Sequence, residues 1–264
     1  MSHSTLTYSD NAGSDREDLE TGGSIDGLEV NHVVGHSITI GTTYAPICRG
    51  NVYQTPTTAQ TLEIVSDDAT DNAAGVGARE VTLIGLDSSW NIVQTTVIPA
   101  GVTPVTIDTD FIRFFKGYVS SSGTYATATA GSHAGTLTIR DAATSTVIWA
   151  VIDASEVALG ETEIGAYTVP AGKKALVKYW SANVDSKKSA DILFSQRPNA
   201  NDITSPYSGT MKVIDQAHGV VGELTRVVHA PMGIFDQYTD IGFLGRADSV
   251  SGIAINFEIQ VSDR

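Results

Sequence analysis

The sequence predicts an all-β protein: two antiparallel β-sandwiches, the second of them jelly-roll-like, behind an extended N-terminal arm. Residues 253–261 alternate strictly, with Ile253, Ile255, Phe257, Ile259 and Val261 on one face. Residues 174–180 alternate in the same way after a turn at residues 169–172. A period of two indicates a strand with one buried face, and no stretch longer than about three turns keeps helical spacing. We expect these two strands to pair in one antiparallel sheet.

Residues 1–50 are predicted to form an acidic arm followed by the first strands. Residues 1–30 contain seven acidic side chains and one basic side chain, Arg16. Residues 1–24 are too polar to fold alone, so we expect a neighbouring subunit to hold them. Strand-like sequence begins at Ile25, and the connector at residues 51–61 contains Pro56, which is incompatible with a central strand.

Residues 51–141 are predicted to form the first sandwich. Its strands are expected at residues 61–66, 80–86, 92–98, 111–120 and 135–141. Small residues at 67–77 and a turn at 86–91 separate these strands. The Ser, Gly, Thr and Ala residues at 120–134 predict an exposed, mobile loop, because such residues offer little to pack.

Residues 142–264 are predicted to form the jelly-roll-like sandwich. Residues 146–153 are apolar on both faces, which indicates a central strand. In the next strand, Ala175, Val177 and Tyr179 should share one face and Lys174, Leu176, Lys178 and Trp180 the other. Further strands are expected at residues 191–196, 242–246 and 253–261, and a short helix is expected within residues 211–224.

Charge and composition exclude several classes of partner. The net charge is −14, and nucleic acids and anionic lipids both need a clustered basic surface. The five clustered lysines are expected to be solvated loop and edge-strand residues that discourage edge pairing; they are Lys173, Lys174, Lys178, Lys187 and Lys188. No signal peptide or transmembrane run is present in this sequence, so we expect a soluble product made in the cytoplasm.

No arrangement for nucleophilic catalysis is found, and we expect no enzyme activity, no catalytic residue and no cofactor. The histidines are His3, His32, His36, His133, His218 and His229. None lies in a nucleophile elbow, since Gly131-Ser132-His133-Ala134-Gly135 has its serine one place too early. His133 is expected to be exposed, and Cys48, the one cysteine, to be buried and inert.

Acidic, glycine-rich and aromatic groups are the remaining candidate sites. Asp67, Asp68 and Asp71, and Asp108 with Asp110, could ligate Ca²⁺ or act as a glycosidase pair, but solvated turns are favoured. Residues 75–80 lack the third glycine and the helix of a dinucleotide site. Trp90, Trp149 and Trp180 could stack on sugars, but core or hairpin packing is favoured for all three; Trp90, in a hairpin turn, is the first to test for sugar binding. The predicted metal and cofactor sets are therefore empty.

The segment at residues 66–97 resembles a segment of virion structural proteins from tailed bacteriophages. An Ala/Gly-rich acidic loop with Gly-Ala-Arg leads into a strand, followed by Gly-Leu-Asp, an aromatic residue and Asn. Phe111-Ile112-Arg113 and Tyr167-Thr-Val-Pro-Ala-Gly-Lys173 are similar to further parts of this pattern, over about residues 57–198. These are turn and strand signatures, so the resemblance implies a scaffold and no catalytic or metal site.

The expected function is therefore a non-enzymatic place in a virion, first on the capsid exterior as a decoration protein. A tail or neck fibre component involved in host attachment is one alternative, and a carbohydrate-binding module is another. The expected partners are further copies of the chain and other virion proteins, with no nucleic acid and no membrane. The expected location is the virion, assembled in the host cytoplasm.

Overall fold

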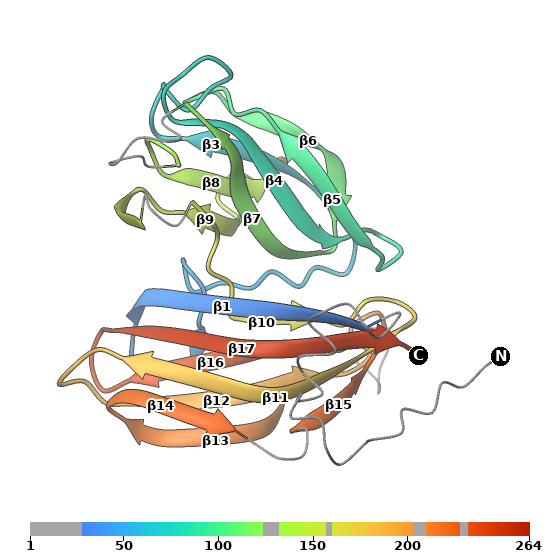
Figure 1. Ribbon diagram of the computed structural model, residues 1–264, viewed down its shortest axis with the longest axis vertical. Helices are drawn as coiled ribbons and strands as arrows, with labels where there is room; N and C mark the ends of the chain where they lie inside the picture. The colour runs from blue at the N-terminus through green and yellow to red at the C-terminus, as the bar shows by residue number, and fades with distance from the viewer. Residues whose placement is uncertain (1–27, 124–131, 157–159, 203–209, 228–231) are drawn as a thin grey trace, which may run out of the picture.

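The computed structural model describes residues 28–123, 132–156, 160–202, 210–227 and 232–264, and these form two stacked β-sandwiches (Figure 1). Apart from one 3-10 turn at Ala154–Glu156, all of the regular structure in these residues is β-strand. The all-β prediction is confirmed. The predicted arm at residues 1–24 and residues 124–131 of the predicted mobile loop lie outside the described residues.

The larger sandwich contains two antiparallel sheets. The first has the order β1 (Leu28–Ile40), β17 (Ser251–Asp263), β11 (Lys173–Val184), and then β14 (Gly222–Val227) and β15 (Gly233–Asp236) side by side along one edge of β11. The second has the order β13 (Lys212–Val220), β12 (Ala190–Arg197), β16 (Asp240–Ala247), and then β2 (Ala45–Pro46) and β10 (Ala166–Thr168) along β16. The predicted pairing of the two long strands is confirmed as β11 with β17.

This strand order is that of a jelly roll. β2 and β10 share one strand position, and β14 and β15 share another, which leaves eight positions. The sheets then have the orders first–eighth–third–sixth and second–seventh–fourth–fifth, the double Greek key of jelly rolls. The facing sheets enclose a core rich in aromatic rings, among them Trp180, Phe194, Phe243 and Phe257.

The face pattern predicted for β11 is wrong beyond Val177. A β-bulge lies between Val177 and Tyr179, which pair with the consecutive residues Ile259 and Glu258 of β17, so Lys178 is the extra residue. Because a bulge adds one residue to one strand only, every later side chain moves to the opposite face. Trp180 is consequently fully buried on the same side as Val177, whereas Tyr179 is only half-buried.

The smaller sandwich is inserted into the larger one. One of its sheets has the order β6 (Val105–Phe111), β3 (Gln60–Ser66), β8 (Leu137–Asp141), β9 (Ile148–Ile152). The other has the order β5 (Ile92–Val97), β4 (Ala78–Leu86), β7 (Arg113–Ser122). Between the sheets lies a second core that includes Leu62, Phe111, Phe114 and Trp149.

The predicted boundaries at residues 50 and 142 do not match the pairing of the strands. β1 pairs with β17, so the first strand belongs to the jelly roll. β9 pairs with β8 at the edge of the inserted sheet, so it is neither a central strand nor part of the jelly roll. Sequence composition does not change at either point, because both sandwiches alternate apolar and polar residues in the same way.

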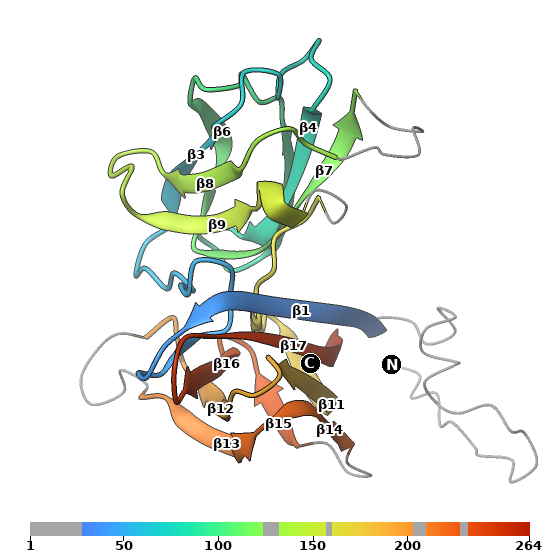
Figure 2. The same ribbon diagram turned by 90° about the vertical axis from the view of Figure 1, so that its left-hand side faces the viewer.

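The insertion interrupts a single strand position of the jelly roll. Pro46 on β2 and Ala166 on β10 lie on the same flank of β16, opposite Leu244 and Gly242. The outgoing and returning chains also pair with each other, since Cys48 faces Ile164 and the Arg49 amide donates to the Glu163 carbonyl at 3.0 Å. The two sandwiches are therefore joined by a two-stranded stem (Figure 2).

The helix expected within residues 211–224 is absent from the described part of that range. β13 and β14 occupy it, one in each jelly-roll sheet, with Val221 between them. Gly219 and Gly222 flank this crossing with positive φ values of 64° and 69°, which glycine adopts at little cost. β13 is an exposed edge strand with polar residues on both faces, so its sequence shows no clean period of two.

Candidate functional site: the junction of the two sandwiches

A buried ion pair joins the two sandwiches at Arg113 and Asp240. Arg113 begins β7 and Asp240 begins β16, and their side chains are 1% and 5% exposed. The guanidinium donates from Nε to Oδ1 at 2.8 Å and from Nη2 to Oδ2 at 3.1 Å. This bidentate geometry fixes both the distance and the angle between the two groups.

Groups from other segments complete the environment of Asp240. Thr168 on β10 donates to Oδ1 at 2.6 Å, and Arg197 on β12 donates from Nε to Oδ2 at 3.0 Å. Burial alone would raise the pKa of Asp240, but the hydrogen bonds and charge of Arg113, with those of Arg197 and Thr168, hold it below its usual value. Tyr53 extends the network to the connector, with its hydroxyl 2.9 Å from the Thr168 hydroxyl.

Trp90 covers this ion pair, in agreement with the packing role that the sequence favours for it. The Arg113 guanidinium lies 4.8 Å from the centre of the Trp90 ring, and Tyr238 packs edge-on against the same ring. The Trp90 carbonyl also accepts the Ala171 amide at 2.9 Å, which connects the 86–91 turn to the jelly roll. Trp90, Trp149 and Trp180 are 8%, 4% and 0% exposed, so all three are packing residues.

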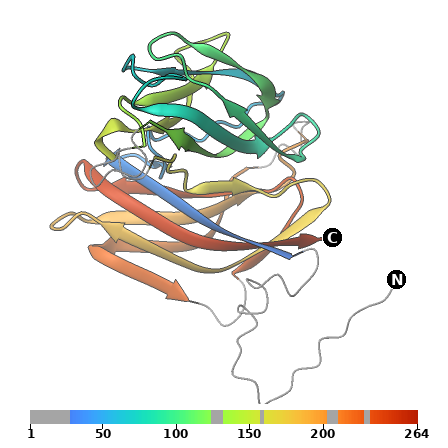
Figure 3. The same ribbon diagram turned by 45° about the horizontal axis from the view of Figure 1, so that its top comes forward.

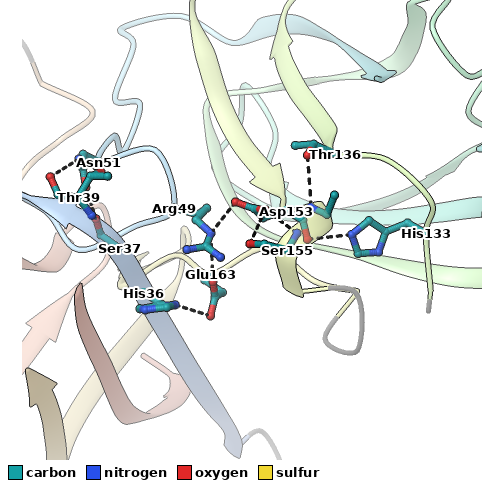
Figure 4. Close-up of polar contacts among 11 residues, drawn as sticks. His36, Ser37, Thr39, Arg49, Asn51, His133, Thr136, Asp153, Ser155 and Glu163 are labelled. Atoms are coloured by element: carbon teal, nitrogen blue, oxygen red, sulfur yellow. Dashed lines mark hydrogen bonds and ion pairs between the residues drawn. The ribbon is translucent and has the colours of Figure 1, made fainter. Parts of the chain in front are cut away.

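A second polar cluster lies at the stem (Figure 4). Arg49 on the outgoing chain is 6% exposed, and its Nε lies 3.2 Å from Asp153 Oδ2 and 3.7 Å from Glu163 Oε2. His36 on β1 approaches the other Glu163 oxygen, with Nδ1 3.3 Å from Oε1. The jelly roll, both stem chains and the end of β9 therefore meet in one cluster of charged groups.

His133 is buried, which corrects the expectation that it is exposed. Its ring is 3% exposed; Nδ1 lies 2.7 Å from Ser132 Oγ and Nε2 lies 3.0 Å from the Asp153 carbonyl. Both ring nitrogens are occupied, and the Asp153 carboxylate faces Arg49 instead. No local sequence pattern indicates this burial, because the contact comes from the Asp153 carbonyl, twenty positions later.

Asp71 is also buried, whereas a solvated turn was predicted for it. It is 0% exposed, and its oxygens accept hydrogen bonds from Ser66 Oγ at 2.6 Å and from the amides of Ala78, Ala134 and Gly135 at 2.7, 2.8 and 2.9 Å. It thereby ties the end of β3 and the start of β4 to the chain just before β8.

The other candidate residues are placed as follows. Asp68 caps the amide of Thr70 at 2.7 Å, Asp67 caps that of Thr136, and Asp110 accepts from Thr61.

Cys48 is buried, and burial raises the pKa of its thiol to about 12. Lys173, Lys174 and Lys178 lie on β11, an inner strand, so the edge-strand interpretation is wrong for them. Among the described residues, no group of three or more His, Cys, Asp or Glu side chains is placed to hold a metal ion.

Sequence reasoning missed the residues that build this junction. The sequence marks Arg113 only through the resemblance at residues 111–113, and no motif distinguishes Asp240, Glu163 or Arg49 from other surface-type residues. The partners Arg113 and Asp240 are 127 positions apart, and no local spacing predicts a pair at that separation. Within the described residues, no helix is long and apolar enough to cross a membrane.

Comparison with known proteins gives little further information. No family model matches the chain, and no match was found among curated proteins. A chain in the structure of infectious bursal disease virus Gx strain is similar at 8% identity and a TM-score of 0.25, over 91% of this chain and 74% of that one. A chain of the infectious bursal virus derived T=1 particles is similar at 8% identity and a TM-score of 0.19, over 91% and 75%. Both are viral particle structures, but similarity this weak supports no conclusion about function.

Proposed function

We propose that this chain is a non-enzymatic structural protein of a tailed-phage virion, placed on the capsid exterior as a decoration protein. The observation that carries the proposal is the rigid junction. Buried charged groups often act in catalysis in enzymes. In this chain, Arg113, Asp240 and Arg49 instead form ion pairs that fix one sandwich on the other. A fixed projecting domain on a jelly-roll base is suited to presenting a surface outward from an assembly.

The sequence resemblance at residues 66–97 and the net charge of −14 support the same proposal. The acidic balance favours protein partners over nucleic acid. The chain would act through contacts with other copies and with a major capsid protein.

A tail or neck fibre component is the second candidate, and one feature favours it. Val76, Ile98 and Val102 are 57%, 51% and 59% exposed. They lie in the loop before β4 and the loop between β5 and β6, both part of the inserted sandwich, which is the upper body in Figure 3. Exposed apolar side chains at a projecting end suit contact with another protein, including a host receptor.

The structure does not support the carbohydrate-binding alternative, because that alternative needs exposed tryptophan rings. Trp90, Trp149 and Trp180 are all buried, so none offers a free ring face for a sugar. We expect no saturable binding of the chain on a glycan array. Saturable binding that Trp90→Ala abolishes would instead support a carbohydrate-binding module.

Copy number tests the proposal directly. Quantitative mass spectrometry of purified particles should find the chain in high copy, on the scale of the major capsid protein, and particles lacking it should rupture under milder heat or osmotic shock. A few copies per particle, together with inhibition of adsorption by the purified chain, would instead identify the fibre component. Absence from particles would overturn both.

A further inference from the structure

A cleft lies between the jelly roll and the inserted sandwich, beside the first half of β1. It has a volume of about 260 Å³ and is lined by β1 on one side and by β4, β5 and β7 on the other. Its wall includes Asn31, Val34, Ile92, Gln94, Phe115 and Tyr167. Figures 1 and 2 show β1 running beneath the inserted sandwich along this side.

β1 presents an unpaired backbone edge to this cleft. β1 is the outermost strand of its sheet and pairs only with β17 in the described part of the chain. At Gly35 the stem packs closely on the face of β1, since a Cβ there would overlap Gly165 and the Ile47 carbonyl. The part of this edge that borders the cleft runs from Glu29 to Val34, a length that accepts a short added strand.

The cleft also contains groups that lack partners. Val34 and Ile92 are 40% and 44% exposed on its two sides. Tyr167 is 5% exposed and stacks on Phe115, but its buried hydroxyl has no hydrogen-bond partner among the described residues. A buried hydroxyl without a partner is destabilising, so an occupant with an acceptor that reaches it would gain a hydrogen bond.

We propose that this cleft binds residues 4–9 of a second copy of the chain as a strand added to β1. Ser4-Thr5-Leu6-Thr7-Tyr8-Ser9 has no charged side chain and is rich in β-forming residues, and Leu6 and Tyr8 alternate onto one face. This face matches the apolar wall at Val34 and Ile92. The proposal rests on the proposed assembly function and names the contact through which copies join.

The sequence between this segment and β1 favours a second copy over the same chain. Residues 10–27 contain six acidic side chains and one basic side chain, and charged linkers repel themselves and extend. Extended chain spans about 3.3 Å per residue, so this linker reaches up to roughly 60 Å beyond the start of β1. Folding back onto its own β1 would instead bring these acids toward Glu29 at the cleft, where Glu161 is already paired with Lys116.

Site-directed cross-linking of the full chain tests the proposal. One preparation carries Tyr8→Cys and the other Val34→Cys, and they are mixed with a short thiol–thiol cross-linker. Cys48 is buried and silent, as the unmodified chain should show. A covalent heterodimer should form, and adding Leu6→Asp to the first preparation should reduce it about tenfold, which corresponds to about 1.4 kcal/mol.

The matched control replaces Val34→Cys by Ile234→Cys. Ile234 is 67% exposed on β15, at the opposite edge of the same sheet, and should give no heterodimer. Equal cross-linking at both positions, or none at Val34, would overturn the proposal. So would cross-linking of a Tyr8→Cys, Val34→Cys double variant solely within one chain. None of these results alters the copy number in particles, so the proposed function is tested separately.

Discussion

Asp71 and Asp240 differ from ordinary loop aspartates because both are buried and fully hydrogen-bonded. A carboxylate leaves water only when several donors replace its hydration, and these donors come from distant segments in both cases. For Asp71 they are loop amides of the inserted sandwich, and for Asp240 they are side chains from both sandwiches. At this scale the chain is stabilised by a few long-range polar groups.

Replacing Asp71 by Ala should destabilise the inserted sandwich strongly. Ser66 Oγ and the amides of Ala78, Ala134 and Gly135 would lose their acceptor, and each buried donor left unpaired costs about 1–3 kcal/mol. We expect a loss of at least about 3 kcal/mol in the free energy of unfolding, measured by urea titration. Asp68→Ala, on the exposed side of the same loop, is the control and should change the midpoint little; equal effects would contradict this account.

Asp240→Asn should remove an acid-dependent part of the stability. Because the folded pKa of Asp240 lies below the unfolded value of about 3.9, its stabilisation is fully present above about pH 4 and is lost as the pH falls through the folded pKa. At pH 7 the variant leaves Arg113 buried without its counter-charge, which should cost about 3–5 kcal/mol.

The difference in stability between the wild type and the Asp240→Asn variant should shrink as the pH falls below about 4. Thermal unfolding in a pH series measures this difference. Asp191→Asn is the control, because Asp191 pairs with Arg246 at the surface and such pairs contribute about 1 kcal/mol or less. A difference from wild type that stays constant down to the lowest pH would show that the charge of Asp240 is not what stabilises the junction.

At the scale of elements, the bulge in β11 explains how Trp180 reaches the core. Lys178 is the extra residue, and Val177, Tyr179 and Trp180 face Ile259, Glu258 and Phe257 in order. The bulge coincides with the change of neighbour from β15 to β14 on the other edge of β11. One inserted residue therefore sets the face of the whole second half of the strand.

Deleting Lys178 should be tolerated, because the strand then becomes regular with the same side chains in the core. Deleting Ser181 should not be, because it forces either Trp180 or Ala182 and Val184 onto the wrong face. Circular dichroism and thermal unfolding should show a folded protein with a modest loss of melting temperature for the first deletion. Deletion of Ser181 should give insoluble or unfolded protein. If deletion of Ser181 were tolerated and deletion of Lys178 were not, the assigned register would be wrong.

At the scale of the whole molecule, the jelly roll should fold without its insertion. Because Cys48 faces Ile164 across the stem, residues 49–163 can be replaced by Asn-Gly, which forms a two-residue hairpin turn. Strand β16 would keep β2 and β10 on its flank. We expect a soluble protein with β-type circular dichroism and cooperative unfolding.

The shortened protein also tests the junction. Asp240 keeps Arg197 but loses Arg113, so Asp240→Asn should cost clearly less in the shortened protein than in the full chain. Urea titrations of the four proteins give this comparison. A shortened protein that does not fold would show that the jelly roll depends on the insertion, and an equal cost in both backgrounds would place the effect of Asp240 within the jelly roll.

The sequence by itself determined the strands that bury one face and expose the other. β17 alternates as expected, and the strands predicted near residues 61–66, 80–86, 92–98 and 191–196 all exist, because burial on one face imposes a period of two on the residues themselves. The all-β class followed from this local signal alone.

Only the tertiary structure decided where the insertion begins and ends, which face Trp180 takes, and that Arg113 meets Asp240. It also decided that Trp90, His133 and Asp71 are buried. Each of these depends on a partner far along the chain: β17 for β1, β8 for β9, and Asp240 for Arg113. Contacts between distant residues leave no periodic trace in either stretch of sequence, so the junction became visible only once the strands were paired.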